Sequence, residues 1–264
     1  MTDDGVGFVT DTTGGARPFS AQRPEKPVAL VTGASGGFGA AVAAELDRLG
    51  CRVALHYNSA EGGAREVRER LVNDSIVVQA DVGDWDSVSA LHRRVVEELG
   101  EVDILVSNAA VRKDALLMSQ SPEVWSQVVR TNLVGTFHVC RAVLPSMVRR
   151  RWGRIINVVS PSALVATSGQ TAYAASKAGV IGLTRTLATE CGRRGVTVNA
   201  LSPGFMETRM TANATERFRQ NLAANLPVPR LTTPEEVAPA IGVFLDNDYV
   251  TGQVLSVDGG ISLT

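Results

Sequence analysis

The sequence predicts a doubly wound α/β fold, in which one parallel β-sheet carries helices on both faces. From Val28 onward, short runs of β-branched residues alternate with amphipathic stretches of helical period, a pattern typical of parallel sheets with crossover helices. The alternation continues to the end of the 264-residue chain and leaves no room for an independent second domain. We therefore expect a single domain from Val28 to Thr264.

The expected elements follow in strict order along the chain. Strands are predicted at 28–31, 52–55, 76–78, 103–106, 154–159, 196–200 and 253–257. Helices are predicted after the first strand through Leu49, near 61–72, at 84–99, from about 122 to 150, from about 171 to 191, and near 234–245. Each helix thus separates two strands, as a parallel sheet requires.

Two segments fall outside this alternation. Residues 1–27 are rich in Thr, Gly, Asp and Pro and show neither period, so they are predicted to be a flexible N-terminal leader. The stretch near 204–230 is polar with weak helical periodicity and follows the carboxyl end of a strand, where open sheets bind ligands. It is predicted to be a small lid.

The charge balance excludes several classes of function. The chain has 26 Lys plus Arg against 27 Asp plus Glu, a formal net charge of −1, so it lacks the basic excess that favours nucleic acid or anionic membranes. No apolar run approaches the roughly 18 residues of a membrane span, and the N-terminus does not resemble a signal peptide. Three scattered cysteines indicate neither a disulfide framework nor a metal site. We expect a soluble, cytoplasmic protein.

A glycine-rich turn, Val31-Thr32-Gly33-Ala34-Ser35-Gly36-Gly37-Phe38-Gly39, lies between the first strand and its helix. Glycine permits a tight turn and lets backbone N–H groups approach a pyrophosphate at the helix N-terminus. A strand before the turn and a helix after it are what a Rossmann-type dinucleotide site requires. The predicted cofactor-binding residues here are Gly33, Ser35, Gly37, Phe38 and Gly39.

The end of the second strand bears on the choice of cofactor. An acid there normally binds the ribose 2′-hydroxyl of NAD, but this strand ends in His56-Tyr57-Asn58-Ser59. A carboxylate would repel a 2′-phosphate, so Asn58 and Ser59 favour NADP(H). Asp81 and Val82, after the third strand, are candidate adenine contacts, although Asp81 is equally well placed to cap the next helix.

Tyr173 and Lys177 stand four residues apart, so on a helix both side chains project from one face. A free tyrosine hydroxyl, with a pKa near 10, is a sluggish acid–base catalyst at neutral pH, and a nearby ammonium group lowers that pKa. The spacing therefore predicts a catalytic tyrosine, although the same spacing also occurs on exposed amphipathic helices.

Two further polar residues complete a candidate catalytic set. Ser160 follows a strand at its carboxyl end, where its hydroxyl could donate a hydrogen bond to a substrate carbonyl; Ser162 lies close enough to be confused with it. Asn132 falls within the predicted long helix, where asparagine is a mediocre helix former that usually needs a local hydrogen bond.

Together these motifs resemble the short-chain dehydrogenase/reductase family. The resemblance covers Val28 to the end and rests on the glycine turn, Asn108-Ala109-Ala110, Asn132, Ser160, Tyr173-x-x-x-Lys177 and Pro203-Gly204, in this order. Within the family the likeness is greatest to 3-oxoacyl-acyl-carrier-protein reductases, through motifs that include Gly153-Arg154-Ile155-Ile156-Asn157 and Pro203-Gly204-Phe205-Met206-Glu207-Thr208.

The resemblance implies a role for each site residue. Tyr173 would protonate the carbonyl oxygen as hydride arrives from the nicotinamide, Lys177 would lower the pKa of the tyrosine and bind the nicotinamide ribose, and Ser160 would orient the carbonyl. Asn132 would hold a water that links Lys177 to solvent. Cofactor contacts are also implied for Asn108, Ala109, Tyr173, Lys177, Pro203, Gly204 and Thr208.

The resemblance also implies a function. It is the NADPH-dependent reduction of a 3-ketoacyl thioester, bound to an acyl carrier protein, in fatty-acid or polyketide biosynthesis by a homotetramer. Arg151 and Arg194 best match the basic patch with which related reductases meet the acidic carrier, although cations at helix C-termini need no partner. Two alternatives stay open: a reductase or dehydrogenase of a free ketone, alcohol or sugar, and a protein that binds NADP(H) without turnover.

Overall fold

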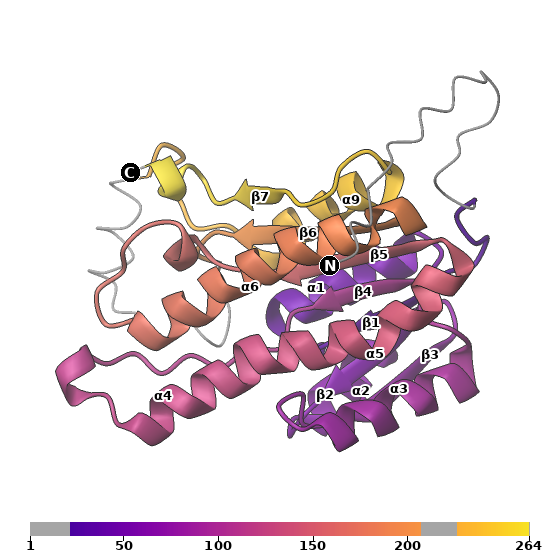
Figure 1. Cartoon of the computed structure of the whole chain (residues 1–264), viewed down its shortest axis with the longest axis horizontal. Coiled ribbons are helices and arrows are strands. Elements are labelled where there is room, and N and C mark those ends of the chain that lie inside the picture. Colours follow the sequence, from indigo (N-terminus) through magenta and orange to yellow (C-terminus); the bar gives the residue numbers. More distant parts are fainter. Residues whose placement is uncertain (1–21, 207–225, 264) are drawn as a thin grey trace, which may run out of the picture.

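The sheet is continuous and wholly parallel. The computed structural model describes residues 22–206 and 226–263, and within them seven strands pair in the order β3-β2-β1-β4-β5-β6-β7 (Figure 1). The strands are β1 (Val28–Val31), β2 (Arg52–Tyr57), β3 (Ser75–Gln79), β4 (Ile104–Ser107), β5 (Gly153–Val158), β6 (Val196–Pro203) and β7 (Val254–Val257). The predicted doubly wound α/β fold is confirmed.

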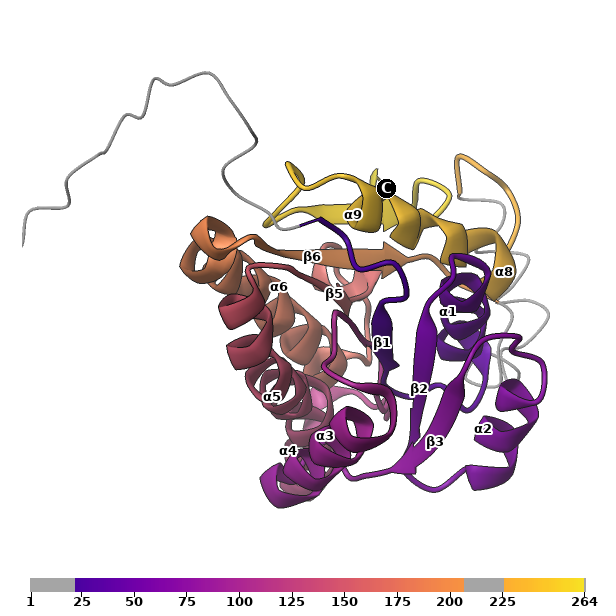
Figure 2. The ribbon, with the colours of Figure 1, turned by 90° about the vertical axis from the view of Figure 1, so that its right-hand side faces the viewer.

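Helices cover both faces of this sheet (Figure 2). One face carries α1 (Gly37–Arg48), α2 (Glu61–Arg68), α8 (Pro234–Val237) and α9 (Gly242–Asp246). The other carries α3 (Trp85–Leu99), α5 (Gly135–Arg150) and α6 (Thr171–Cys191), with α4 (Pro122–Val129) packed against α6. From β1 the chain builds the sheet on one side, through β2 and β3, and then crosses back to add β4 on the other side of β1. This reversal makes a topological switch point at the carboxyl end of β1.

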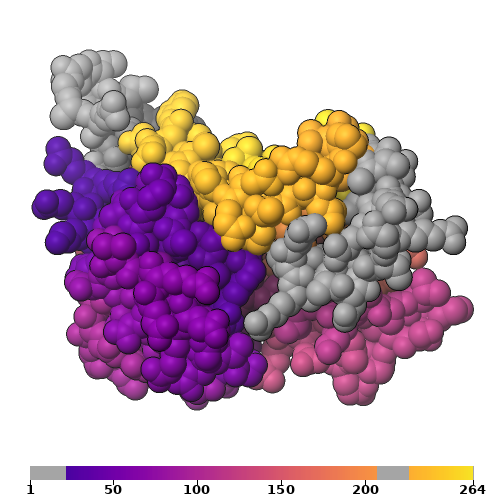
Figure 3. Space-filling view, turned by 180° about the vertical axis from the view of Figure 1, so that it is seen from behind, coloured from indigo at the N-terminus to yellow at the C-terminus, as the bar shows by residue number. Residues whose placement is uncertain are grey.

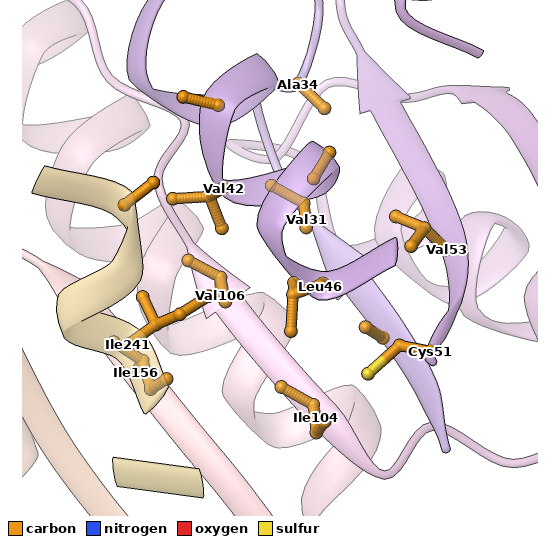
Figure 4. Packing of buried hydrophobic residues seen from close by; sticks show 14 of the residues in the cluster. Val31, Ala34, Val42, Leu46, Cys51, Val53, Ile104, Val106, Ile156 and Ile241 are labelled. Atoms are coloured by element: carbon orange, nitrogen blue, oxygen red, sulfur yellow. The ribbon is translucent and has the colours of Figure 1, made fainter. Parts of the chain in front are cut away.

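Both faces of the central strands are buried, which explains their uninterrupted apolar runs. Val31 and Val106 face α1, where they meet Val42 and Leu46, and Ile241 joins the same cluster from the C-terminal part of the chain (Figure 4). In the space-filling view the yellow C-terminal helices accordingly lie against the indigo and purple N-terminal part (Figure 3). The neighbouring residues of these strands point to the opposite face and pack against α3 and α5.

Two predicted helices differ from the observed ones. The long helix expected at 122–150 is interrupted by one π-helical turn, Arg130–Val134, between α4 and α5. The helix expected near 234–245 is divided by a 3-10 turn, Ala238–Ile241, that contains Pro239, because proline has no N–H for an α-helical hydrogen bond. Strand β6 extends to Pro203 rather than ending at Ala200.

The predicted leader lies mostly outside the described residues. In the part that the structure describes, Arg23 pairs with Asp246 at 3.1 Å and donates a hydrogen bond to the carbonyl of Leu49. The end of the predicted leader is therefore attached to the body of the domain.

A buried carboxylate joins the amino ends of β1 and β4 to the carboxyl end of α5. Asp103 is 3% exposed, accepts a 2.8 Å hydrogen bond from the backbone N–H of Val28, and pairs with the guanidinium of Arg150 at the end of α5. Arg150 also donates to the carbonyl of Val102 at 2.7 Å. This ion pair therefore fixes α5 to the start of β1 and β4.

Replacement of Asp103 by alanine should leave the guanidinium and the Val28 N–H without their partner, so the free energy of unfolding should fall by about 3 kcal/mol or more. Chemical denaturation of the variant measures this loss. Glu101→Ala is the matched control, because Glu101 pairs with Arg149 on the surface, where such a pair contributes less than about 1 kcal/mol. Equal losses in the two variants would contradict the assigned role of Asp103.

Candidate active site

A cleft of about 440 Å³ opens at the carboxyl ends of the central strands. Four stretches of chain form most of its wall: the turn after β1, the segment after β4, the segment after β5 and the segment after β6. The described lining residues include Gly33, Ser35, Gly37, Phe38, Gly39, Asn108, Ala109, Ala110, Arg112, Ser160, Ser162, Gln170, Tyr173, Lys177, Pro203 and Gly204. Most residues predicted from different parts of the sequence thus meet in one cavity.

The glycine turn has the close backbone contacts that its sequence predicted. A Cβ atom at Gly39 would lie 2.2 Å from the carbonyl oxygen of Gly33, and one at Gly33, where φ is +68°, would lie 2.9 Å from the Cα of Ala109. Helix α1 begins at Gly37, and no side chain caps its first turn. The first residues of α1 line the cleft. Uncapped N–H groups at a helix N-terminus favour an anion such as a pyrophosphate.

Residues from two neighbouring strands hold this turn in place. The side-chain amide of Asn108 donates to the carbonyls of Thr32 and Gly33 at 3.0 and 3.1 Å, and the Thr32 hydroxyl accepts from the N–H groups of Asn108 and Ala109. His56 accepts a hydrogen bond at Nδ1 from the Gly33 N–H and donates one from Nε2 to the carbonyl of Ala80, both at 3.0 Å. No sequence pattern predicted this contact of His56 with the glycine turn.

The residues predicted to select the cofactor are less directly placed. Asn58 and Ser59 are exposed after β2 and do not line the 440 Å³ cleft, whose wall on that side ends at Ala60. Asp81 accepts from the N–H of Gly83 and pairs with Arg130 at 3.0 Å. Helix α3 is capped by Asp84, which removes the capping alternative for Asp81.

Val82, the other predicted adenine contact, is buried at 5% exposure. Its carbonyl accepts a 3.0 Å hydrogen bond from His138 on α5. The adenine contacts of Asp81 and Val82 stay predictions.

Helix α6 presents Tyr173 and Lys177 to the cleft beside Ser160. Ser160 and Tyr173 line the same cleft, and hydrogen bonding by Ser160 lowers the pKa of the Tyr173 hydroxyl against the effect of burial. The Lys177 ammonium, 2% exposed, donates to the carbonyl of Val158 at 2.7 Å and lies 5.9 Å from the centre of the Tyr173 ring. The Ser162 hydroxyl instead donates to Gln170 at 2.6 Å, and Ser160 is the serine that affects the pKa of Tyr173.

Burial is the largest influence on the pKa of Tyr173 and raises it above its usual value. Hydrogen bonding by Ser160 lowers that pKa; the smaller effects of Arg112, which lowers it, and of Asp114, which raises it, oppose each other. The Lys177 amine is directed at the Val158 carbonyl, and burial lowers its own pKa to about 8. The effect of Lys177 on the pKa of Tyr173 stays a prediction.

Asn132 lies in the π-helical turn and is completely buried. Its side-chain oxygen accepts from the N–H of Val111 at 2.8 Å, and its amide donates to the Val111 carbonyl at 3.0 Å and to the Ser176 hydroxyl at 3.1 Å. The side chain thus joins the segment after β4 to helix α6. The water link to Lys177 that the family resemblance implies stays a prediction.

The remaining predicted residues fall into two groups. Pro203 and Gly204 line the cleft, and a Cβ atom at Gly204 would lie 2.7 Å from the Cα of Asp258. Thr208, together with most of the predicted lid near 204–230, lies outside the described residues.

Arg151 and Arg194 lie at the opposite edge of the sheet from the cleft. Arg151 precedes β5 and Arg194 precedes β6. Two basic runs, Arg149–Arg151 and Arg193–Arg194, meet where Arg151 donates to the carbonyl of Arg193 at 3.3 Å. At about 3.3 Å per residue, the length of β5 separates this edge from Ser160 by roughly 20 Å. Arg154 cannot join a surface patch, because it is 4% exposed and lies over the Trp152 ring.

The part of the chain that the structure describes offers no metal site of three or more His, Cys, Asp or Glu side chains. Within the same residues, no helix is long and apolar enough to cross a membrane.

A parallel sheet with a glycine turn at its switch point and a Ser–Tyr–Lys group facing that turn defines a dinucleotide-dependent oxidoreductase of the α/β class. A family model described as enoyl-(acyl carrier protein) reductase matches residues 33–262. The chain belongs to the short-chain dehydrogenase/reductase family, whose members use a nicotinamide cofactor.

Curated relatives match almost the whole chain. The 3-oxoacyl-acyl-carrier-protein reductase of Vibrio harveyi is 42% identical over 240 residues, which are 90% of this chain and 98% of that protein. The enzyme of the same name from Pseudomonas aeruginosa is 42% identical over 243 residues, with the same coverage of the two chains. That from Staphylococcus aureus strain Mu50 is 40% identical and covers 88% of this chain and 97% of its own.

The buried His56 predicts a pH dependence of cofactor affinity. Burial lowers its pKa below the ordinary value, and a proton added at Nδ1 would oppose the Gly33 N–H. Stability and cofactor affinity should therefore be complete above about pH 6.5 and fall as the pH drops through the lower pKa of the folded protein. Titration of cofactor binding between about pH 7.5 and about pH 5.5 measures this dependence.

His56→Gln should flatten that profile, whereas His92→Gln should leave it as in the wild type, because His92 lies outside the cleft. The comparison with the variant also corrects for the cofactor, since a phosphate monoester itself titrates near pH 6. Identical pH profiles for His56→Gln and the wild type would contradict the role of His56 in the pH dependence of cofactor binding.

Proposed function

We propose that this chain catalyses the NADPH-dependent reduction of a 3-ketoacyl thioester, carried by an acyl carrier protein, to the 3-hydroxyacyl thioester, in fatty-acid or polyketide biosynthesis. One observation carries the proposal: Ser160, Tyr173 and the buried Lys177 line the same cleft as the glycine turn. The names of the relatives support the substrate class.

The residues of the cleft fit a bound nicotinamide cofactor. At positions 33 and 39 only glycine fits, because a Cβ atom there would collide with neighbouring backbone. The first turn of α1 also lacks a side-chain cap, so the turn suits a pyrophosphate. Gly33, Gly37 and Asn108 would hold the dinucleotide, which supplies a hydride to the substrate carbon. Lys177 would bind the nicotinamide ribose.

Two hydroxyl groups would act on the substrate oxygen. Tyr173 would donate its proton to the carbonyl oxygen as negative charge develops there, and Ser160 would donate a second hydrogen bond to the same atom. The raised pKa of Tyr173 favours the protonated phenol at neutral pH, which is the state that reduction consumes. Lys177, with a pKa of about 8, would supply the replacement proton through the water that Asn132 is expected to hold.

NADP(H) rather than NAD(H) is supported by the lack of an unpaired carboxylate among the described residues that line the cleft or follow β2. Among the described residues that line the cleft, the charged ones are the cations Arg112 and Lys177. Asn58 and Ser59, which follow β2, carry no charge to repel a 2′-phosphate. Asp81 is neutralised by its ion pair with Arg130.

The test is an activity panel of carrier-bound 3-ketoacyl substrate, a small free 3-ketoacyl thioester and simple ketones, each with NADPH and NADH. We expect turnover of the thioesters with NADPH preferred, and a loss of roughly a thousandfold or more in kcat for Tyr173→Phe with cofactor binding retained. Full activity of that variant would exclude the tyrosine mechanism. Turnover of free ketones alone would favour the alternative reductase, and no turnover at all would favour a cofactor-binding protein.

Carrier docking at Arg151 and Arg194 is part of the proposal. Both residues end helical segments near the amino edge of the sheet, and the Arg151–Arg193 contact brings the two basic runs together. The roughly 20 Å to the cleft of the same subunit means that a docked carrier reaches this cleft with an extended acyl arm, or serves a neighbouring subunit.

Charge reversal at both positions, Arg151→Glu with Arg194→Glu, should raise KM for the carrier-bound substrate roughly tenfold or more at low salt. The small free thioester is the matched control, and its KM should not change. If the double variant handles both substrates as the wild type does, the arginines are solvated helix ends.

A homotetramer in the cytoplasm completes the proposal. Large apolar side chains are exposed along α5 and in the segment before α4, among them Phe137 at 43% and Met118 at 90%, as expected of surfaces that meet a second copy. The three free cysteines are all buried, which is compatible with a reducing compartment.

A further inference from the structure

One cation of the cleft, Arg112, has no contact with substrate or cofactor in the chemistry described above. Arg112 lies in the segment after β4 and lines the cleft together with Ser160, Ser162, Gln170 and Tyr173. Its side chain is 22% exposed and pairs through Nε with Asp114 at 3.2 Å. The guanidinium is therefore part of the cavity wall rather than a solvated surface group.

The backbone that carries Arg112 is fixed on both sides. The preceding residue, Val111, has both its N–H and its carbonyl bound to the buried side chain of Asn132. Three residues after Arg112, the N–H of Ala115 donates to the carbonyl of Gly169 at 2.9 Å. A binding group held in this way loses little conformational freedom when a ligand arrives.

A chain of side-chain hydrogen bonds connects Arg112 to the catalytic serine. Asp114 accepts from the amide of Gln170 at 3.3 Å, the Gln170 oxygen accepts from the Ser162 hydroxyl, and the Ser160 hydroxyl donates to that of Ser162 at 3.3 Å. Gln170 is 6% exposed and Ser162 is 8% exposed. This network sets the orientation of Arg112 relative to Ser160 and Tyr173.

The effect of Arg112 on the pKa of Tyr173 is smaller than that of burial or of Ser160, and Asp114, its ion-pair partner, opposes it. Among the described residues that line the cleft there is no carboxylate, so an oxygen atom of a bound molecule would meet the Arg112 guanidinium and not a side chain that repels it. A guanidinium is a strong donor to carbonyl and carboxylate oxygens.

We propose that Arg112 is a specificity-determining residue that binds the C1 oxygen of a 3-oxoacyl substrate, while Ser160 and Tyr173 bind the C3 oxygen. The inference rests on the proposed function and adds to it a requirement for a second oxygen in a 1,3 relation to the ketone. The C1 oxygen belongs either to a thioester or to a free carboxylate, and both are acceptors for the same guanidinium.

The proposal predicts a particular kinetic signature. The charge on the C1 oxygen changes little during reduction at C3, so its bond with Arg112 has nearly the same strength in the ground state and in the transition state. Loss of such uniform binding raises KM and leaves kcat nearly constant. A residue that acted through Tyr173 would instead change kcat and its pH profile.

The experiment compares wild type, Arg112→Met, Arg112→Lys and the control Lys113→Met, which removes a neighbouring exposed cation. The substrates are a small 3-oxoacyl thioester, the free 3-oxo acid and a monoketone of equal length without the C1 oxygen. For Arg112→Met we expect KM for the 3-oxoacyl substrates to rise roughly 10- to 100-fold, with kcat and the monoketone kinetics unchanged within about threefold. Arg112→Lys should recover part of the loss.

The outcomes separate this inference from the proposed function. Equal losses for the monoketone and the thioester, or a fall in kcat at constant KM, would overturn the role of Arg112 while the function stands. A greater loss with the free acid than with the thioester supports the role and identifies a carboxylate ligand. A wild-type enzyme that reduces the monoketone alone overturns both. Unchanged melting temperatures of the Arg112 variants and the Lys113 control show that the fold is intact.

Discussion

The contact between the first turn of α1 and the backbone after β1 is the constraint on which the cleft depends. With a hydrogen atom in place of a side chain at Gly39, the helix approaches so closely that a Cβ atom would lie 2.2 Å from the Gly33 carbonyl. His56 on β2 and Asn108 directly after β4 then bind the polar groups of the turn, and the Thr32 hydroxyl of the turn accepts from the Ala109 N–H. The parallel register brings Val31, Val106 and Ile156 to one level, so the segments that follow these strands converge on one cavity.

Burial favours the neutral forms of the two ionisable groups of the proposed catalytic set, Tyr173 and Lys177. A phenol whose pKa is raised by burial keeps its proton at neutral pH, and a neighbouring hydroxyl aligns it. Burial affects the two ionisable groups in opposite directions, because desolvation penalises the charged form of each: the phenolate and the ammonium. The lysine consequently has a pKa of about 8, close enough to neutrality to give up a proton. A tyrosine with a strongly lowered pKa would instead be poised for oxidation of an alcohol.

The fold and half of the site followed from local pattern, and the rest required tertiary contacts. The glycine turn and the Tyr173–Lys177 pair are visible in the sequence because their members are close neighbours on one turn or one helix face. The role of His56 depends on the pairing of β1 with β2, which sets its ring against Gly33. The π-helical turn reflects bonds from Asn132 to Val111 and Ser176, which are 21 and 44 residues away, and such bonds leave no periodic signal.

The arginines at the amino ends of the strands and the one at their carboxyl ends have different roles. Sequence position alone does not distinguish these roles. At the amino ends of the strands Arg150 is bound to a buried carboxylate and Arg154 is stacked on Trp152, so two of the four arginines at positions 149, 150, 151 and 154 support the fold. At the carboxyl ends of the strands, Arg112 lies in a segment without helical or strand period, yet the backbone bonds of Val111 and Ala115 and a side-chain hydrogen-bond network hold it in the cleft wall. Charge density along a sequence is therefore a poor guide to binding here, because burial and pre-organisation decide whether a guanidinium meets the protein or its ligand.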